Sequence, residues 1–426
     1  MACAGRCRPV TAVDLRPILR PGDRIVAGQA CGEPTTLIEA LIAQAGDIPD
    51  LSLFIATSFS GLLTPAAVDG IRVASMGAIG ALRGLTKAHR LSVVPCHVSR
   101  VGPMISSGEM PCDVAFIQVA PAEPDGTHSL GLISDHVLAA VRAARVVVAE
   151  VNERVPRSCG ERIDTRAIDH VVPVARDPVR VQPATITPVD EAIARHVAEF
   201  VEDGSVLQTG IGAVPDAVLR LLRDRADLGV HSGMIGDGLV DLVESGVITN
   251  ARKEIDTGVS VTGALIGTER LYRFADRNPA IRMCTTDHTH DPAVLARLSR
   301  LVTVNAAVEV DLTGQVNAEQ SGTAYLGGTG GQVDFVRAGA RSPGGHAIIV
   351  APSTAKGGTV SRITPGLSGP VTTARSEVDV IVTEYGAARL AGCTLAERAR
   401  RLTAISHPDF RDGLEQAARA IEQRGF

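Results

Sequence analysis

The chain has 426 residues, 45% hydrophobic and 21% charged, which is the composition of a folded globular protein rather than a disordered one. Its formal net charge of −5, from 42 basic and 47 acidic residues, argues against a nucleic-acid surface. With three Tyr, eight Phe and no Trp, the chain also lacks the residues of a base-stacking platform or an aromatic cage. At about 100–200 residues per domain, the length predicts two or three domains.

The cysteines and the hydropathy of the chain bear on its location. Eight cysteines are scattered, and the closest pair, Cys3 and Cys7, has no partner pair at zinc-ligand spacing. The N-terminal residues lack the apolar run of a signal peptide, and no apolar run approaches the about 18 residues of a spanning helix. We therefore expect a cytoplasmic protein with reduced thiols and no membrane contact.

Short apolar or β-branched runs recur along the chain and predict buried strands of mainly parallel sheets. They are Leu51–Ser58, Val114–Ala120, Arg145–Val151, Ser205–Gly210, Ala347–Pro352 and Val378–Thr383. Helical patterns lie between these runs, and this alternation predicts an α/β fold with crossover connections.

End signals predict two helices in the second half of the chain. Thr187 and Pro188 have the types of an N-cap and a first helical residue, and an apolar stripe follows until Asp203-Gly204, where we expect the helix to end. Pro215 is expected to begin the second helix, which turns apolar residues to one face.

An irregular segment and an internal repeat predict two domains. Asp177–Thr187 has two prolines and no periodicity, so we place a linker there and divide the chain into domains 1–182 and 183–426. Pro21–Leu41 and Asp203–Leu222 share one pattern: a strand between two glycines, a turn of small residues and a proline at the helix start. A duplicated α/β unit explains the repeat, and chance similarity of Gly and Pro spacing is the alternative.

A turn in the second half is a candidate anion site. Gly210, Ile211, Gly212 and Ala213 lie between a predicted strand and a predicted helix, where free backbone N–H groups suit a phosphate. The pattern is GxGxxP, not the GxGxxG of dinucleotide folds, so it gives little support to a nucleotide-dependent oxidoreductase. Tight packing of strand on helix is the alternative explanation.

A second candidate is the loop within Tyr325–Phe335. Gly327, Gly328, Gly330 and Gly331 fill four of five consecutive positions, a density that favours close approach of a ligand. Successive N–H groups there can hold an anion or stabilise an oxyanion, and a mobile surface loop is the alternative.

Other motifs predict little chemistry. The histidines of Asp287–Asp291 (DHTHD) would point to opposite sides of a strand, and Pro292 favours a loop, so we expect no metal there. No GxSxG elbow occurs, and Lys356 lies outside any Walker pattern.

Longer stretches are more specific. They include LQTGIGAVPDAVL (207–219), DGLVDLVESGVITN (237–250), VDLTGQVNAE (310–319) and GGTGGQVDF (327–335). These stretches resemble the acetyl-CoA hydrolase/transferase family, particularly its 4-hydroxybutyrate CoA-transferase branch, and the likeness covers nearly the whole chain. It implies two tandem CoA-transferase-type (NagB/RpiA-like) α/β domains, acyl-CoA and a carboxylate as substrates, and no metal. A homo-oligomer is left open.

The resemblance also implies a covalent mechanism and a binding site for coenzyme A. In this family a glutamate attacks the acyl carbonyl, which gives an acyl-glutamyl anhydride and then a glutamyl-CoA thioester. Carried over by position, Gly210–Ala213 and Gly327–Gly331 would contact CoA, and Ser353 and Lys356 would lie close by. Lys356 would pair with a CoA phosphate, unless it is a plain surface lysine.

One position departs from the family pattern. The nucleophilic glutamate belongs to a His-Ser-Glu-Met-like segment, which reads His231-Ser232-Gly233-Met234 in this chain. Because Gly233 has no side chain, neither covalent intermediate can form at that position. Glu309 and Glu319 are candidate substitute carboxylates, and His231 and Asp237 are the nearest polar residues in the sequence.

Two functions are therefore open. The first is an acyl-CoA transferase or hydrolase that works without a glutamyl-CoA intermediate. The second is a catalytically inactive homologue that still binds CoA or acyl-CoA.

Overall fold

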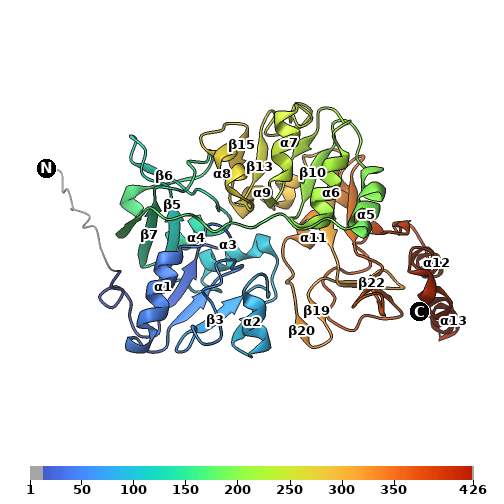
Figure 1. Ribbon diagram of the computed structural model, residues 1–426, viewed down its shortest axis with the longest axis horizontal. Coiled ribbons are helices and arrows are strands. Elements are labelled where there is room, and N and C mark those ends of the chain that lie inside the picture. Colours follow the sequence, from blue (N-terminus) through green and yellow to red (C-terminus); the bar gives the residue numbers. More distant parts are fainter. Residues whose placement is uncertain (1–12, 425–426) are drawn as a thin grey trace. The chain divides into compact units, whose positions relative to one another are not determined.

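The computed structural model describes residues 13–424, so Cys3 and Cys7 lie outside the described residues. The contacts divide the chain into two compact units, and Figure 1 shows their elements. Unit 1 is formed by Met1–Val181, as far as it is described, together with Thr262–His288, and unit 2 by Gln182–Val261 and Thr289–Phe426, as far as it is described. Residues 175–187, around the division, carry neither helix nor strand.

Unit 1 is built on a seven-stranded parallel sheet with the order β4-β3-β2-β1-β5-β7-β9 (Figure 1). The strands are β1 (Arg24–Ala27), β2 (Ser52–Phe54), β3 (Arg72–Ser75), β4 (Leu91–Val93), β5 (Val114–Val119), β7 (Val146–Asn152) and β9 (His170–Val174). The helices between them are α1 (Thr35–Gln44), α2 (Leu82–Lys87), α3 (Val98–Ser107) and α4 (Val137–Ala143). Every residue of β5 is buried, as expected for a central strand covered on both faces.

Further short elements complete unit 1. They are β6 (Thr127–Ser129), β8 (Arg162–Asp164), β14 (Ala264–Leu265), α8 (Glu269–Ala275), β15 (Ile281–Met283) and α9 (Thr286–Thr289), whose last residue lies in unit 2. β13 (Ser260–Thr262) begins in unit 2 and ends in unit 1.

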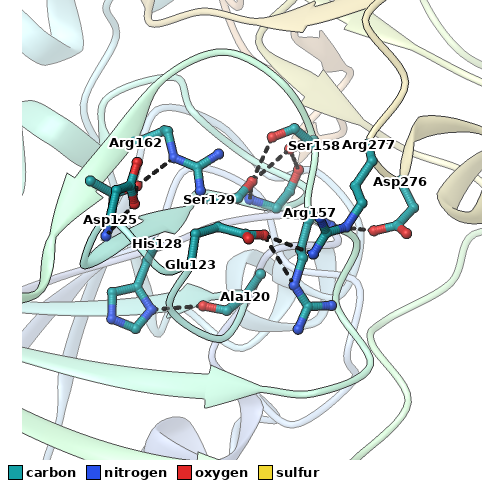
Figure 2. A network of polar contacts seen from close by, with 12 residues as sticks. Ala120, Glu123, Asp125, His128, Ser129, Arg157, Ser158, Arg162, Asp276 and Arg277 are labelled. Atoms are coloured by element: carbon teal, nitrogen blue, oxygen red, sulfur yellow. Dashed lines mark hydrogen bonds and ion pairs between the residues drawn. The ribbon is translucent and has the colours of Figure 1, made fainter.

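The segment Thr262–His288 departs from the sequence-based division, which assigned it to the second domain. Its backbone forms bridges with unit 1, between Ile133 and Ala264 and between Gly160 and Met283. Figure 2 shows a polar network that ties it further, in which the Glu123 carboxylate pairs with Arg157 at 3.3 Å and with Arg277 at 3.1 Å. These contacts join sequence-distant segments, which local patterns do not reveal. The domain boundaries themselves stay a prediction.

Unit 2 contains a six-stranded sheet with the order β11-β10-β16-β21-β25-β26 (Figure 1). The strands are β10 (Val206–Thr209), β11 (Gly229–Val230), β16 (Leu301–Ala306), β21 (His346–Val350), β25 (Val380–Thr383) and β26 (Gly386–Arg389). The pairs from β11 to β25 are parallel, and β26 is antiparallel to β25. The predicted α/β class with mainly parallel sheets is therefore confirmed.

Helices cover this sheet, and further short strands form separate small sheets. The helices are α5 (Pro188–Ala198), α6 (Ala213–Leu221), α7 (Gly238–Glu244), α10 (Pro292–Leu295), α11 (Gln332–Arg341), α12 (Leu395–Ala404) and α13 (Pro408–Arg424). The short strands are β12 (Met234–Ile235), β17 (Glu309–Asp311), β18 (Val316–Asn317), β19 (Gln320–Ser321), β20 (Ala324–Tyr325), β22 (Thr354–Ala355), β23 (Val360–Ser361) and β24 (Ile363–Thr364). α11 packs against β16 and β21, which fixes its N-terminus near the carboxyl ends of the parallel strands.

The six predicted strand runs all contain strands of the two large sheets, although the run Leu51–Ser58 holds only the short β2. Both predicted helices form, but their ends differ. α5 begins after Thr187, whose hydroxyl forms a capping box with Asp190, yet it ends at Ala198 rather than near Asp203. α6 begins at Ala213, two residues before Pro215, because the first turn of a helix needs no N–H partner and tolerates proline. No helix of the described residues is long and apolar enough to cross a bilayer.

Candidate functional site

The turn between β10 and α6 is open rather than tightly packed. Gly212 has a φ of 118°, a backbone conformation that side chains rarely adopt. A Cβ atom built on Gly210 or on Gly212 meets no atom within 4 Å. Packing of strand on helix therefore does not explain these glycines, and the geometry favours the ligand-binding interpretation of Gly210, Ile211, Gly212 and Ala213.

In the loop before α11, different structural features explain the glycines at different positions. A Cβ on Gly327 would lie 2.5 Å from the Ala318 carbonyl oxygen, and Gly330 has a φ of 58°. Gly331 is the N-cap of the ten-residue α11, with an ordinary φ of −93°. Gly328 lies in the same loop, between Gly327 and the N-terminus of α11. Because a helix leaves its first four N–H groups without intrahelical partners, these donors begin at Gly331.

The imidazole of His290 lies between Gly233 and Gly331. A Cβ on Gly233 would lie 2.7 Å from Cε1 and 2.8 Å from Nε2 of His290, and a Cβ on Gly331 would lie 2.6 Å from the same Nε2. Gly233 has no positive φ, so contact with the ring, not the backbone conformation, opposes a side chain there. We call this arrangement of Gly233, His290 and Gly331 the histidine slot.

The ring of His290 is held from several sides. Its Nδ1 lies 2.8 Å from the Thr289 hydroxyl, and its ring packs on Phe335 with centroids 4.7 Å apart. Phe335 belongs in turn to an apolar cluster of unit 2 that includes Val206 and Leu301. The ring is therefore anchored on the core of this unit, with 3% of His290 exposed.

The segment of Gly233 is tied to the β10–α6 turn. The Ser232 hydroxyl donates to the Thr209 carbonyl at 3.0 Å, at the end of β10, and to the Met234 carbonyl at 2.7 Å. The ring Nε2 of buried His231 lies 3.2 Å from the Thr289 carbonyl oxygen. The structure thus brings the Gly210 turn, Gly233 and the start of α11 around one buried histidine.

Burial controls the charge of His290. Desolvation lowers its pKa to about 3, and repulsion from nearby His231 contributes in the same direction. The imidazole is consequently neutral at physiological pH, with one ring nitrogen protonated and the other available as an acceptor.

Asp237 lies immediately before α7 and near the first turn of α6. The pKa of Asp216 in that turn is raised mainly by burial and further by the charge of Asp237, while Arg220 opposes the shift. Two carboxylates therefore lie near the α6 N-terminus and partly offset its positive potential.

The segment Ser353–Lys356 leads into a hairpin of β22 and β23. Ser353 is buried, and both its amide and its hydroxyl donate to the Glu384 carboxylate, at 2.8 and 2.6 Å. Lys356 is exposed at the hairpin turn with a φ of 50°. Ser353 thus has a structural partner, whereas the Lys356 ammonium lies at the surface, where a phosphate could reach it.

Glu309 and Glu319, the candidate substitute carboxylates, are both engaged. Glu309 accepts from Asn317 at 3.0 Å, from the Ser368 amide at 2.7 Å and from the Gly369 amide at 3.1 Å. Glu319 accepts from Thr372 at 2.8 Å and from the Tyr325 hydroxyl. A carboxylate with this many donors is a poor nucleophile, so these contacts disfavour the substitute role, which stays a prediction.

The DHTHD motif does not form the predicted loop. Asp287, His288 and Thr289 lie in α9, and His290 lies in the bend between α9 and α10. Asp291 is the N-cap of α10, and its carboxylate accepts from the amides of Ala293 and Val294. His288 is partly exposed while His290 is buried, so the two rings lie in different environments. Among the described residues no group of three or more metal-ligating side chains is found.

Comparison with known proteins now adds to this geometry. Residues 8–191 match the acetyl-CoA hydrolase/transferase N-terminal domain and residues 267–418 match the C-terminal domain. The 4-hydroxybutyrate coenzyme A transferase of Clostridium kluyveri is 39% identical over 396 residues, which are 92% of each chain. The chain belongs to the acetyl-CoA hydrolase/transferase family.

Two further relatives extend the comparison for this family member. The crystal structure of RipA from Yersinia pestis matches with a TM-score of 0.89 and 35% identity, covering 95% of both chains. An acetyl-CoA hydrolase of Eremothecium gossypii is 29% identical over 346 residues, which are 70% of this chain and 64% of that relative. The family resemblance drawn from the sequence motifs is confirmed.

Sequence reasoning missed the most constrained residue of this family member. It considered His290 only as half of a metal motif, and it did not single out Phe335 or Thr289. No local signal marks His290, because Gly233 and Gly331 lie far from it in the sequence. Of the predicted site residues, the structure brings Gly210–Ala213, Gly233 and Gly331 to connected segments, whereas Lys356 lies on a separate hairpin.

Proposed function

We propose that this protein is an acyl-CoA-dependent enzyme that works without a glutamyl-CoA intermediate. As a member of its family it is an acyl-CoA transferase or an acyl-CoA hydrolase, with CoA thioesters as substrates. The observation that carries the finer proposal is the histidine slot: the position of the family's nucleophilic glutamate holds Gly233, and a buried imidazole fills the space beside it. An attacking group must then come from the solvent or from the acceptor carboxylate itself.

In this proposal the glycine turns bind CoA. The open turn Gly210–Ala213 and the N–H groups at the start of α11 supply backbone donors for phosphate or thioester oxygens. Exposed Lys356 pairs with a CoA phosphate, and Ser353 positions the hairpin that carries it. The acceptor is water or a small carboxylate, and the site needs no resident metal. We further propose a cytoplasmic location, and a homo-oligomer is compatible with these roles.

The second candidate is an inactive homologue that binds CoA or acyl-CoA without turnover. The same loss of a side chain at Gly233 favours it, because covalent catalysis supplies a large part of the rate in an acyl-transfer enzyme. Preorganised donors and bound water can nevertheless leave appreciable catalysis after a nucleophile is lost.

The experiment combines binding, turnover and mass spectrometry. We expect calorimetry to detect CoA binding, and a panel of acyl-CoAs with and without acetate to show thioester cleavage without any protein-bound CoA. A Lys356→Ala variant should weaken CoA binding, while Lys87→Ala in unit 1 is the matched control. No CoA binding at all would refute the acyl-CoA assignment. Binding without cleavage would establish the inactive homologue, and a CoA adduct on any carboxylate would refute the non-covalent pathway.

A further inference from the structure

His290 occupies the volume that a side chain at position 233 would need. The contact is with the far edge of the ring, Cε1 and Nε2, at 2.7 and 2.8 Å from the ideal Cβ position of Gly233. The same Nε2 lies 2.6 Å from the ideal Cβ position of Gly331, where α11 begins. One ring nitrogen therefore lies against both glycines, and this close packing is possible only because neither position carries a side chain.

This nitrogen has no internal partner. Nδ1 interacts with the Thr289 hydroxyl at 2.8 Å, whereas Nε2 makes no hydrogen bond within residues 13–424. Nε2 is not among the fully buried atoms that lack a partner, so it keeps a small accessible surface on a residue that is only 3% exposed. A ring nitrogen that is accessible and has no protein partner can accept a hydrogen bond from a water molecule or a substrate group.

We propose that His290 takes the place of the missing carboxylate as a general base that directs water onto the acyl-CoA thioester, which makes this protein an acyl-CoA hydrolase. This inference rests on the proposed function, since it requires that acyl-CoA binds at the glycine turns. It assigns the attacking group to water rather than to an enzyme carboxylate, so CoA transfer to a second carboxylate becomes the minor reaction.

The Thr289 contact is compatible with the tautomer that this role requires, because a hydroxyl oxygen can accept a hydrogen bond from Nδ1. When Nδ1 carries the proton and donates it to the Thr289 hydroxyl oxygen, Nε2 is left with a free lone pair directed into the slot. The ring packing on Phe335, at 4.7 Å between centroids, keeps that lone pair in one direction. Thr289 thereby acts as the orienting residue, in the way that a second group orients the base in other hydrolases.

The chemical step balances with water as the only co-reactant. The water oxygen forms a bond to the thioester carbonyl carbon while one water proton passes to Nε2 of His290. The tetrahedral oxyanion is stabilised by N–H groups at the start of α11. On collapse the carbon–sulfur bond breaks, and the proton passes from Nε2 to the CoA sulfur. The products are a carboxylic acid and the CoA thiol, and the imidazole returns neutral.

The surroundings of His290 keep its imidazole neutral before the reaction. Burial holds the pKa of His290 at about 3, with His231 as the interacting titratable neighbour. The free lone pair is thus present over the whole physiological pH range, but a base with so low a pKa is also weak. The expected contribution is therefore at the lower end of general-base catalysis, about 10²-fold.

The test compares substitutions of His290 with a control two residues away. His290→Gln and His290→Asn keep a polar side chain but cannot take up a proton, and we expect each to lower kcat for hydrolysis by about 10²-fold. The calorimetric Kd for CoA should change less than threefold, and the melting temperature reports whether the variant is folded. His288→Ala, in the short helix α9 just before His290 and partly exposed, should leave kcat unchanged.

A second readout separates catalysis from structural support. The wild type should show a solvent deuterium isotope effect on kcat that His290→Gln lacks, because proton transfer to Nε2 accompanies water attack. Folded His290→Gln with kcat within threefold of wild type overturns the inference, and so does a wild type that transfers CoA to acetate without hydrolysis. A wild type that binds no CoA would instead overturn the proposed function. Calorimetry distinguishes this outcome, because it measures CoA binding independently of turnover.

Discussion

The histidine slot makes a quantitative prediction about stability that needs no substrate. In Gly233→Ala the new methyl group would lie 2.7 Å from Cε1 and 2.8 Å from Nε2 of His290, well inside van der Waals contact. The ring is held by Thr289 and Phe335, so it cannot move away freely. Forcing an extra methyl group into packed surroundings costs about 1–3 kcal/mol, and we expect Gly233→Ala to lose that much free energy of unfolding.

Gly210→Ala is the matched control for this substitution. Gly210 lies on a connected segment of the same unit, its φ is not positive, and a Cβ there meets nothing within 4 Å. The free energy of unfolding should therefore change by less than about 0.5 kcal/mol, or rise slightly because alanine restricts the unfolded chain. Comparing the two variants removes the general effect of replacing glycine by alanine.

A double-mutant cycle with His290→Ala identifies the ring as the obstacle. Because the two residues are in contact, the double variant should be at least about 1 kcal/mol more stable than the sum of the two single effects predicts. Urea denaturation followed by circular dichroism measures all four proteins. Additive effects, or a Gly233→Ala variant as stable as wild type, would refute the contact between the His290 ring and position 233. The argument that His290 replaces the missing carboxylate would then fail as well.

Three other expectations can be checked on the free protein. The lowered pKa of His290 means that the unfolded state binds an additional proton between about pH 6.5 and 3, so stability should fall as pH drops through this range, and His290→Asn should flatten that slope in denaturation curves measured at several pH values. Burial and the neighbouring Glu319 raise the pKa of Tyr325, so ultraviolet titration should show a tyrosine that ionises well above the usual range, and Tyr325→Phe should remove that step. Thr187→Ala removes the capping box of α5 and should cost about 1 kcal/mol of stability, whereas Thr187→Ser should cost little.

Local patterns determined much of the architecture. The β-branched runs predicted central strands such as β5 and β21 because a strand that is buried on both faces must be apolar at consecutive positions. The start of α5 followed from Thr187 and Pro188, since capping involves residues within one turn. The end of α5 at Ala198 was not predicted, because the apolar stripe continues beyond the helix to the buried Phe200 and Val201.

Part of the functional site could likewise be predicted from the sequence, and part could not. The glycine turns and the missing side chain at Gly233 could be read from the sequence, because they are local features of a motif. The position of His290 could not, since Gly233, His290 and Gly331 lie on three separate segments that meet only when α11 packs against its strands. Sequence alone showed that Gly233, where the family resemblance leads us to expect a glutamate, has no side chain. Only the tertiary structure decided what fills the space, because contact between distant segments depends on the packing of the whole unit.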